Sequence, residues 1–196
     1  FKTFEQGFPD CAFPGQAMAK GQLSLQVYKP RKPVPERHRS KSKGKSPVVV
    51  FVHGGGWRNG SPSNLVLNNQ GGGTPQFLLE QGFTIVSVAY RLVCAHADGI
   101  DMLDDLRSAV RYIEEHCESW GCDASNILLW GISAGAHLSL SLAYSNFFPS
   151  IKGIVSFYGP AEIREKALLA ALPSGVFDSF QANVMLKATR ELCNNS

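Results

Sequence analysis

The chain has 196 residues, 44% of them hydrophobic and 19 of them glycine, which suits one globular domain over residues 1–196 and excludes a fibrous or fully disordered chain. Its apolar runs fall far short of the roughly 20 residues that a membrane span needs, so the sequence predicts no membrane span. The net charge of +3 is unevenly spread, because eight basic residues and one acid between 29 and 45 give an excess of seven and leave 3 − 7 = −4 elsewhere.

The basic stretch at 29–47 is rich in Pro and Ser, which is typical of a solvated loop. We interpret it as such a loop rather than as a polyanion or membrane-surface contact, so no nucleic-acid partner is expected. No signal peptide is visible, which favours the cytoplasm slightly, but the chain starts without Met and the compartment stays open.

Five cysteines are present, and no two have the spacing of a metal-binding CxxC pair, so no metal is expected. Reduced thiols are the expected state, because an odd number cannot pair completely. Cys117 and Cys122 are close enough in sequence to form a disulfide in an oxidising compartment. The full set is Cys11, Cys94, Cys117, Cys122 and Cys193.

In chain order, the first half contains three predicted strands and one helix. Residues 23–28 alternate apolar and polar side chains, which predicts a strand with one buried face. Residues 48–52 are continuously apolar, as in a strand buried on both faces of a parallel sheet. Thr74 as N-cap and Pro75 at the first helical position predict a helix, and a third strand follows over 83–90.

The second half continues the alternation. Apolar residues spaced by three and four within 100–116 predict an amphipathic helix lying on a sheet. A short strand over 126–130 is followed by a helix over 136–144 and by a last strand over 154–158. Strands alternating with helices of this length predict an α/β fold, with a mainly parallel sheet flanked by helices.

The GISAG motif of residues 131–135 lies between a predicted strand and a predicted helix. A Gly-x-Ser-x-Gly nucleophile elbow needs this setting, because its tight turn requires small flanking residues and lifts the Ser133 hydroxyl above the strand ends. The alternative is that Gly131 and Gly135 only let the helix pack closely on its strand. The setting favours the elbow, with Ser133 as the nucleophile.

The HGGGW motif of residues 53–57 follows the most apolar strand. Gly54, Gly55 and Gly56 leave backbone N–H groups uncovered, as an oxyanion hole requires. The alternative is an ordinary flexible turn. Because open α/β sheets place their sites at the carboxyl ends of the strands, two motifs that each follow a parallel strand favour one shared active site.

With these motifs the chain resembles the α/β-hydrolase fold and, within it, the carboxylesterases and lipases related to hormone-sensitive lipase. The similarity covers most of residues 23–160, including Tyr90-Arg91-Leu92 and the helix before the elbow. Kynurenine formamidases and prenylcysteine methylesterases are similar too, so the substrate class stays open.

The resemblance implies that Ser133 is acylated and that the backbone N–H groups of Gly55, Gly56 and Ala134 hold the oxyanion, without a metal or an organic cofactor. The resemblance also implies that His53 braces the glycine loop. Trp57 is expected to be either a wall of the substrate pocket or part of the core. Cys94 and His96, after a strand end, are loop residues more often incidental than part of a site.

The sequence lacks an evident acid and base for a triad. In this fold the chain order is Ser, then Asp or Glu, then His. The only His after Ser133 is His137, one turn into the elbow helix, and its ring is expected to point along the helix away from the hydroxyl. Glu162 and Asp178 follow, but neither ends an evident late strand. We therefore expect this chain alone to be inactive.

The strand count agrees, because the strand at 154–158 is the last one and would expose an apolar sheet edge, which proteins normally cover. Residues 161–196 are interpreted as a helical cap or crossover segment. We expect a partial domain that lacks the last strands: a fragment, an incomplete gene product or one half of a processed pair. A missing C-terminal half or a second chain would then cover the last strand.

The sequence predicts a serine hydrolase that cleaves a small-molecule carboxylic ester through an acyl-enzyme. One alternative is an amide or formamide hydrolase that uses the same residues. Another is a non-catalytic hydrolase-fold protein that keeps the site for binding, and a more distant one is a polyanion-binding module built on residues 29–45. The acyl and alcohol groups of the substrate are not predicted.

Overall fold

The computed structural model describes residues 23–30, 44–65, 72–92, 97–145 and 147–160. Several sequence predictions lie outside these residues: most of the basic loop, the tail at 161–196 with Glu162 and Asp178, and the side chains of Cys11, Cys94, His96 and Cys193.

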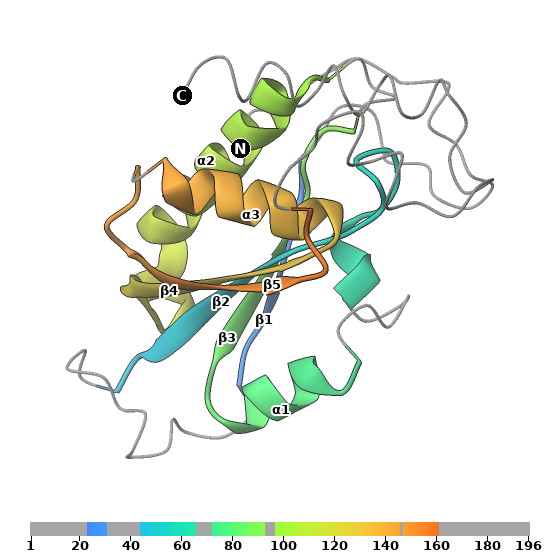
Figure 1. The fold of residues 1–196 in the computed structure, drawn as a ribbon. Helices are drawn as coiled ribbons and strands as arrows, with labels where there is room; N and C mark the ends of the chain where they lie inside the picture. The colour runs from blue at the N-terminus through green and yellow to red at the C-terminus, as the bar shows by residue number, and fades with distance from the viewer. Residues whose placement is uncertain (1–22, 31–43, 66–71, 93–96, 146, 161–196) are drawn as a thin grey trace.

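The described strands form one five-stranded sheet in the order β1-β3-β2-β4-β5 (Figure 1). β1 pairs antiparallel with β3, and the other neighbours are parallel, so the predicted mainly parallel sheet is confirmed. The strands are β1 (Leu25–Tyr28), β2 (Ser46–Val52), β3 (Thr84–Val88), β4 (Cys122–Ile132) and β5 (Ile151–Phe157).

Helices cover both faces of the sheet. Figure 1 shows α2 and α3 on one face and α1 on the other. A short 3-10 helix, η2, lies between β2 and α1 in the chain. The helices are η2 (Pro62–Leu65), α1 (Thr74–Glu80), α2 (Gly99–Trp120) and α3 (Ala134–Tyr144).

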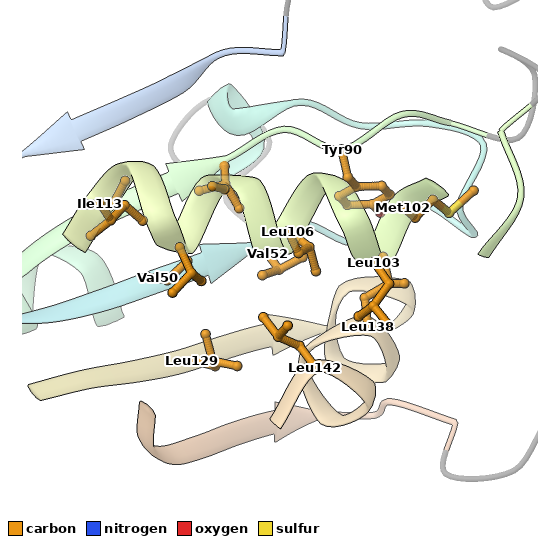
Figure 2. Packing of buried hydrophobic residues seen from close by; sticks show 14 of the residues in the cluster. Val50, Val52, Tyr90, Met102, Leu103, Leu106, Ile113, Leu129, Leu138 and Leu142 are labelled. Atoms are coloured by element: carbon orange, nitrogen blue, oxygen red, sulfur yellow. The ribbon is translucent and has the colours of Figure 1, made fainter. Parts of the chain in front are cut away.

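Successive residues of β2 point to opposite faces, and each face has its own core. Val48, Val50 and Val52 join a cluster formed with apolar residues of α2 and α3. Figure 2 shows this cluster, with side chains of both helices gathered over β2 and β4. Val49 and Phe51 join a second cluster, against which α1 packs. The strand is therefore buried on both faces, as its apolar run predicted.

The ends of the helices explain one wrong prediction. α2 begins with a reciprocal capping box, in which the Asp98 side chain accepts the Asp101 N–H at 2.8 Å and the Asp101 side chain accepts the Asp98 N–H at 3.2 Å. α1 has no side-chain cap, because its N-cap is Gly73. Thr74 is therefore the first helical residue and not the predicted cap, and Pro75 lies one position further in.

Cys117 and Cys122 form a disulfide, so the expectation of reduced thiols was wrong for this pair. α2 ends at Trp120, and its C-cap Gly121, with a left-handed φ of 81°, turns the chain sharply back into β4. The turn brings the two Cα atoms to 5.0 Å, within the range that a disulfide requires. The bridge ties the last turns of α2 to the first residue of β4.

β5 lies at one end of the described sheet and pairs there only with β4. Its side chains are poorly covered: Val155 is 37% exposed and Phe157 is 41% exposed, and Tyr158 beyond the strand is 79% exposed. An apolar strand that would leave an open edge is what the sequence predicted for this segment. Among the described helices, none is long and apolar enough to cross a membrane.

Candidate active site

The sheet register brings both sequence motifs to one end of the sheet. Val52 of β2 lies opposite Val88 of β3 on one side and opposite Gly131 of β4 on the other. Ile132 of β4 lies opposite Phe157 of β5. The HGGGW and GISAG segments therefore start side by side where parallel strands end, which is the place where open α/β sheets bind ligands.

Ser133 occupies a sharp turn between β4 and α3. Its φ of 53° and ψ of −116° lie outside the conformations that non-glycine residues normally adopt. Its N–H donates to the Phe157 carbonyl oxygen at 2.8 Å, and its own carbonyl oxygen accepts the His137 N–H at 3.1 Å. A strained, half-buried serine held by the neighbouring strand has the backbone geometry of a nucleophile elbow.

The two glycines of the elbow are required by close backbone contacts. A Cβ on Gly131 would collide with backbone atoms of Ala136 in the first turn of α3. A Cβ on Gly135 would collide with the carbonyl oxygens of Val52 and His53 at the end of β2. Both glycines thus allow close packing of α3 on the strands, which was the alternative explanation for them in the sequence. The same packing holds the turn that carries Ser133.

The glycine loop lies directly against the elbow. A Cβ built on Gly54 would lie 3.3 Å from the Cβ of Ser133. The loop then turns through three left-handed residues, with φ of 133° at Gly55, 60° at Gly56 and 58° at Trp57. Motifs that are almost 80 residues apart in the chain thus meet at the serine side chain.

Three backbone N–H groups predicted as oxyanion donors are unoccupied. Within the part of the chain that the structure describes, the N–H groups of Gly55, Gly56 and Ala134 have no hydrogen-bond acceptor. Gly55 and Gly56 are half-buried, and Ala134 is buried at the N-terminus of α3, where N–H groups lack helical partners. The segments beside Ser133 therefore carry uncommitted donors of the type that stabilises an oxyanion.

His53 is buried beneath the glycine loop and is neutral at pH 7. Its Nδ1 donates to the Gly54 carbonyl oxygen at 2.9 Å, and burial lowers its pKa to about 4. Its ring stacks on Tyr90, with centroids 4.4 Å apart. Because Nδ1 carries the proton, Nε2 is a buried acceptor that has no partner in the described residues. These contacts suit a residue that braces the loop.

Trp57 and His137 pack against each other behind the site. Trp57 is only 3% exposed and belongs to the core on the α2 and α3 face, so its ring forms core rather than an open wall. The ring of His137 meets it edge to face at 5.5 Å. Burial lowers the pKa of His137 to about 4, so this ring is also neutral at pH 7.

No triad is assembled among the described residues. Neither His53 nor His137 has a carboxylate as hydrogen-bond partner there. No group of three or more His, Cys, Asp or Glu side chains in the same residues is arranged to hold a metal ion. The described site consists of the serine turn and its surrounding backbone donors.

Three residues that shape the site had no role assigned from the sequence. Phe157 accepts the Ser133 N–H, and Gly60 leaves space for the His53 ring, with which its Cβ would collide. Tyr90 contacts His53 through both its ring and its hydroxyl. The one sequence signal for Tyr90 was its position at the end of a predicted buried strand, since the glycine loop also follows the end of such a strand.

Comparisons with known proteins identify the family of the chain. The BD-FAE family model matches residues 37–172. The chain is 29% identical over 154 residues to a probable carboxylesterase 3 of Arabidopsis thaliana, covering 73% of this chain and 47% of the relative. It is 30% identical over 148 residues to Esterase-5A of Drosophila pseudoobscura pseudoobscura, covering 71% and 24%. The chain therefore spans from about a quarter to about half of the length of these relatives.

In structure, the chain is similar to an esterase of Thermogutta terrifontis, Est2 with propionate bound, at a TM-score of 0.57. The match covers 89% of this chain and 60% of that one, and at 20% identity it is a likeness of fold. Together with the strand order and flanking helices, it confirms the predicted fold class. This chain belongs to the BD-FAE family, and its fold is that of an α/β hydrolase.

Proposed function

We propose that this chain carries the nucleophile and the oxyanion hole of a serine esterase that cleaves small-molecule carboxylic esters. The observation that carries the proposal is the strained turn at Ser133, packed against Gly54 of a loop whose next two N–H groups have no acceptor in the described residues. The names of the relatives, carboxylesterase and esterase, support the ester class.

The proposed chemistry has two halves. The Ser133 hydroxyl oxygen attacks the ester carbonyl, and its proton passes to a general base. The tetrahedral oxyanion accepts hydrogen bonds from the N–H groups of Gly55, Gly56 and Ala134, and the alcohol leaves with a proton. Water then attacks the acyl-enzyme and releases the carboxylic acid. Each oxyanion donor contributes about 10²- to 10³-fold in rate.

The two histidines near the elbow are poor candidates for the general base. His53 is buried, with its Nδ1 proton committed to Gly54, and His137 packs against Trp57. We propose that the acid and the base come from polypeptide outside residues 1–196, and that it also covers the edge of β5 that has no partner strand among the described residues. On the HGGGW and GISAG motifs, we propose that the protein is similar to the esterases related to hormone-sensitive lipase.

Hydrolysis of short-chain p-nitrophenyl esters by the protein from the complete coding sequence tests the proposal. Ser133→Ala should lower turnover by up to about 10⁶-fold, to background. The control is Ser141→Ala, which removes a half-buried hydroxyl of α3 that, among the described residues, donates to the His137 carbonyl oxygen. Its turnover should stay within about twofold of the parent, since it touches no reacting group.

Other outcomes decide against the proposal. Turnover that survives Ser133→Ala would show that another group performs the chemistry. A parent protein that binds esters without cleaving them would support the non-catalytic alternative. Faster cleavage of an aryl formamide than of any ester would instead support an amide or formamide hydrolase. Residues 1–196 expressed alone should show turnover close to the limit of detection.

A further inference from the structure

Tyr90 is fully buried just beyond the end of β3 and has no role in the chemistry described above. We propose that Tyr90 is a positioning residue that holds the glycine loop in place through His53. The inference rests on the proposed function, because the glycine loop matters there as the source of the oxyanion donors.

Tyr90 contacts His53 through both its hydroxyl and its ring. Its hydroxyl donates to the His53 carbonyl oxygen at 3.0 Å. Its ring stacks on the His53 ring, with centroids 4.4 Å apart and planes 15° apart. One residue therefore contacts both the main chain and the side chain of His53.

His53 passes this constraint to the serine. Its Nδ1 donates to the Gly54 carbonyl oxygen at 2.9 Å, and Gly54 lies against the Ser133 side chain. Only two residues, His53 and Gly54, thus lie between the Tyr90 ring and the nucleophile. A shift of His53 would move Gly54 and, with it, the N–H groups that follow.

Tyr90 itself is anchored on the other side by α2. The N–H of the next residue, Arg91, donates to Asp105 at 2.8 Å. The Arg91 guanidinium also pairs with Asp105 at 2.8 Å and with Asp101 at 3.1 Å. Asp105 is buried, and its two contacts with Arg91 fix the backbone immediately after Tyr90. The backbone that carries Tyr90 is therefore fixed to α2, a helix, and not to a loop.

The Tyr90 hydroxyl also links the two chain segments just beyond the ends of β2 and β3. The ladder between β2 and β3 ends at Val52 and Val88. Past this point the Tyr90 hydroxyl still joins the two chain segments, through its bond to the His53 carbonyl oxygen. Without the hydroxyl, the His53 carbonyl oxygen would become a buried acceptor without a partner, which favours movement of the loop towards other donors.

An effect of Tyr90 on stability alone can be told apart from an effect on the glycine loop. The same two strands carry a comparable buried hydrogen bond at their opposite ends, which serves as the control. There the hydroxyls of Ser46 and Thr84 are hydrogen-bonded at 2.6 Å. Ser46→Ala removes a buried hydroxyl that links β2 to β3 and also donates to the Gly121 carbonyl oxygen at 3.3 Å, and Tyr90→Phe removes one that links the segments just beyond these strands. Only Tyr90→Phe removes it beside the glycine loop, and it keeps the ring that stacks on His53.

The experiment compares the two variants in the complete protein by ester kinetics, thermal denaturation and amide hydrogen exchange of residues 53–57. Both should lower the melting temperature by a similar few degrees. Tyr90→Phe should also lower kcat about tenfold with little change in KM, less than the loss of a whole oxyanion donor. Amide exchange at 53–57 should accelerate in Tyr90→Phe and stay at the parent rate in Ser46→Ala.

Equal exchange at 53–57 in the two variants would overturn the inference, and so would a Tyr90→Phe variant with parental kcat. If the parent hydrolyses no ester, the proposed function fails, but the exchange comparison still decides whether Tyr90 holds the loop.

Discussion

Replacing Gly131 by alanine should damage the elbow and its stability together. A Cβ at this position would overlap the Cα of Ala136 and the carbonyl oxygen of Gly135, and would lie 2.6 Å from the amide nitrogen of Ala136. All of these are backbone atoms, so no side chain can rotate away. The φ of Gly131 is not in the left-handed region, so the effect comes from the overlap alone.

The magnitude follows from these distances. Ordinary contact begins at 3.4 Å, so the Ala136 amide has to move by about 0.8 Å from its present 2.6 Å. Forcing an extra carbon into a packed interior costs about 1–3 kcal/mol, and the rigid neighbours place this change near about 3 kcal/mol. A displacement of about 1 Å at reacting groups costs about 10²-fold in rate, and Ser133 lies in the same turn.

Urea unfolding followed by tryptophan fluorescence measures the first effect, and ester turnover of the complete protein measures the second. Gly73→Ala is the control for added volume, because no atom lies within 4 Å of the added carbon, and its unfolding free energy should fall by less than about 1 kcal/mol, the cost of an alanine at the N-cap of α1. The reasoning is refuted if Gly131→Ala unfolds at the same urea concentration as Gly73→Ala and retains parental turnover.

Burial lowers the pKa of His53 and of His137 from 6.5 to about 4, so the unfolded chain binds protons between these values that the folded protein does not. The unfolding free energy should therefore be highest above pH 6.5 and should fall as the pH is lowered towards 4. At pH 5 the loss should be about 2 kcal/mol per histidine. Constant urea midpoints from pH 7.5 to pH 5 would contradict this. Asp105→Asn removes a buried charge paired with a guanidinium and should lower the unfolding free energy by about 2–3 kcal/mol, whereas Asp104→Asn, at an exposed ion pair, should change it little. Equal melting temperatures for these two variants would show that the buried pair adds no stability. Cys122→Ser opens a disulfide between residues five apart and should lower the unfolding free energy by about 2 kcal/mol without lowering ester turnover, and unchanged denaturation would count against the bridge.

The parts of the fold that were predictable have a local physical signature. β2 is a run of apolar residues because both of its faces are covered, and that pattern is readable without a structure. The turn at Ser133 was predictable because positions 131 and 135 accept only glycine, since any Cβ there would collide with backbone atoms. That the serine turn lies beside the glycine loop followed from the rule that sites lie at the carboxyl ends of parallel strands.

The parts that were missed depend on contacts between distant segments. β4 begins at Cys122 and not at residue 126, because Cys122 and Asp123 pair with Ser46 and Pro47 before the register shifts. These residues have no apolar alternation of their own, so the strand has no local signal there. The disulfide likewise depends on the left-handed turn at Gly121, which brings the end of α2 back to β4.

The candidate site shows the same division. The residue types that chemistry requires, a serine and a run of glycines, were visible in the sequence. The support of those residues was not, because Tyr90 and Phe157 act through a hydroxyl and a carbonyl oxygen that any buried tyrosine or any backbone could offer. Only the register of β3 and β5 against their neighbours gives these groups their partners.

The central claim is that the Ser133 hydroxyl, on its strained turn beside the glycine loop, is the nucleophile. Treating the complete protein with a fluorophosphonate and mapping the adduct by peptide mass spectrometry tests it most directly, with Ser133→Ala treated in parallel. We predict one stoichiometric adduct on Ser133 and none in the variant. An adduct on another residue, or a folded parent protein that stays unlabelled, would contradict the claim.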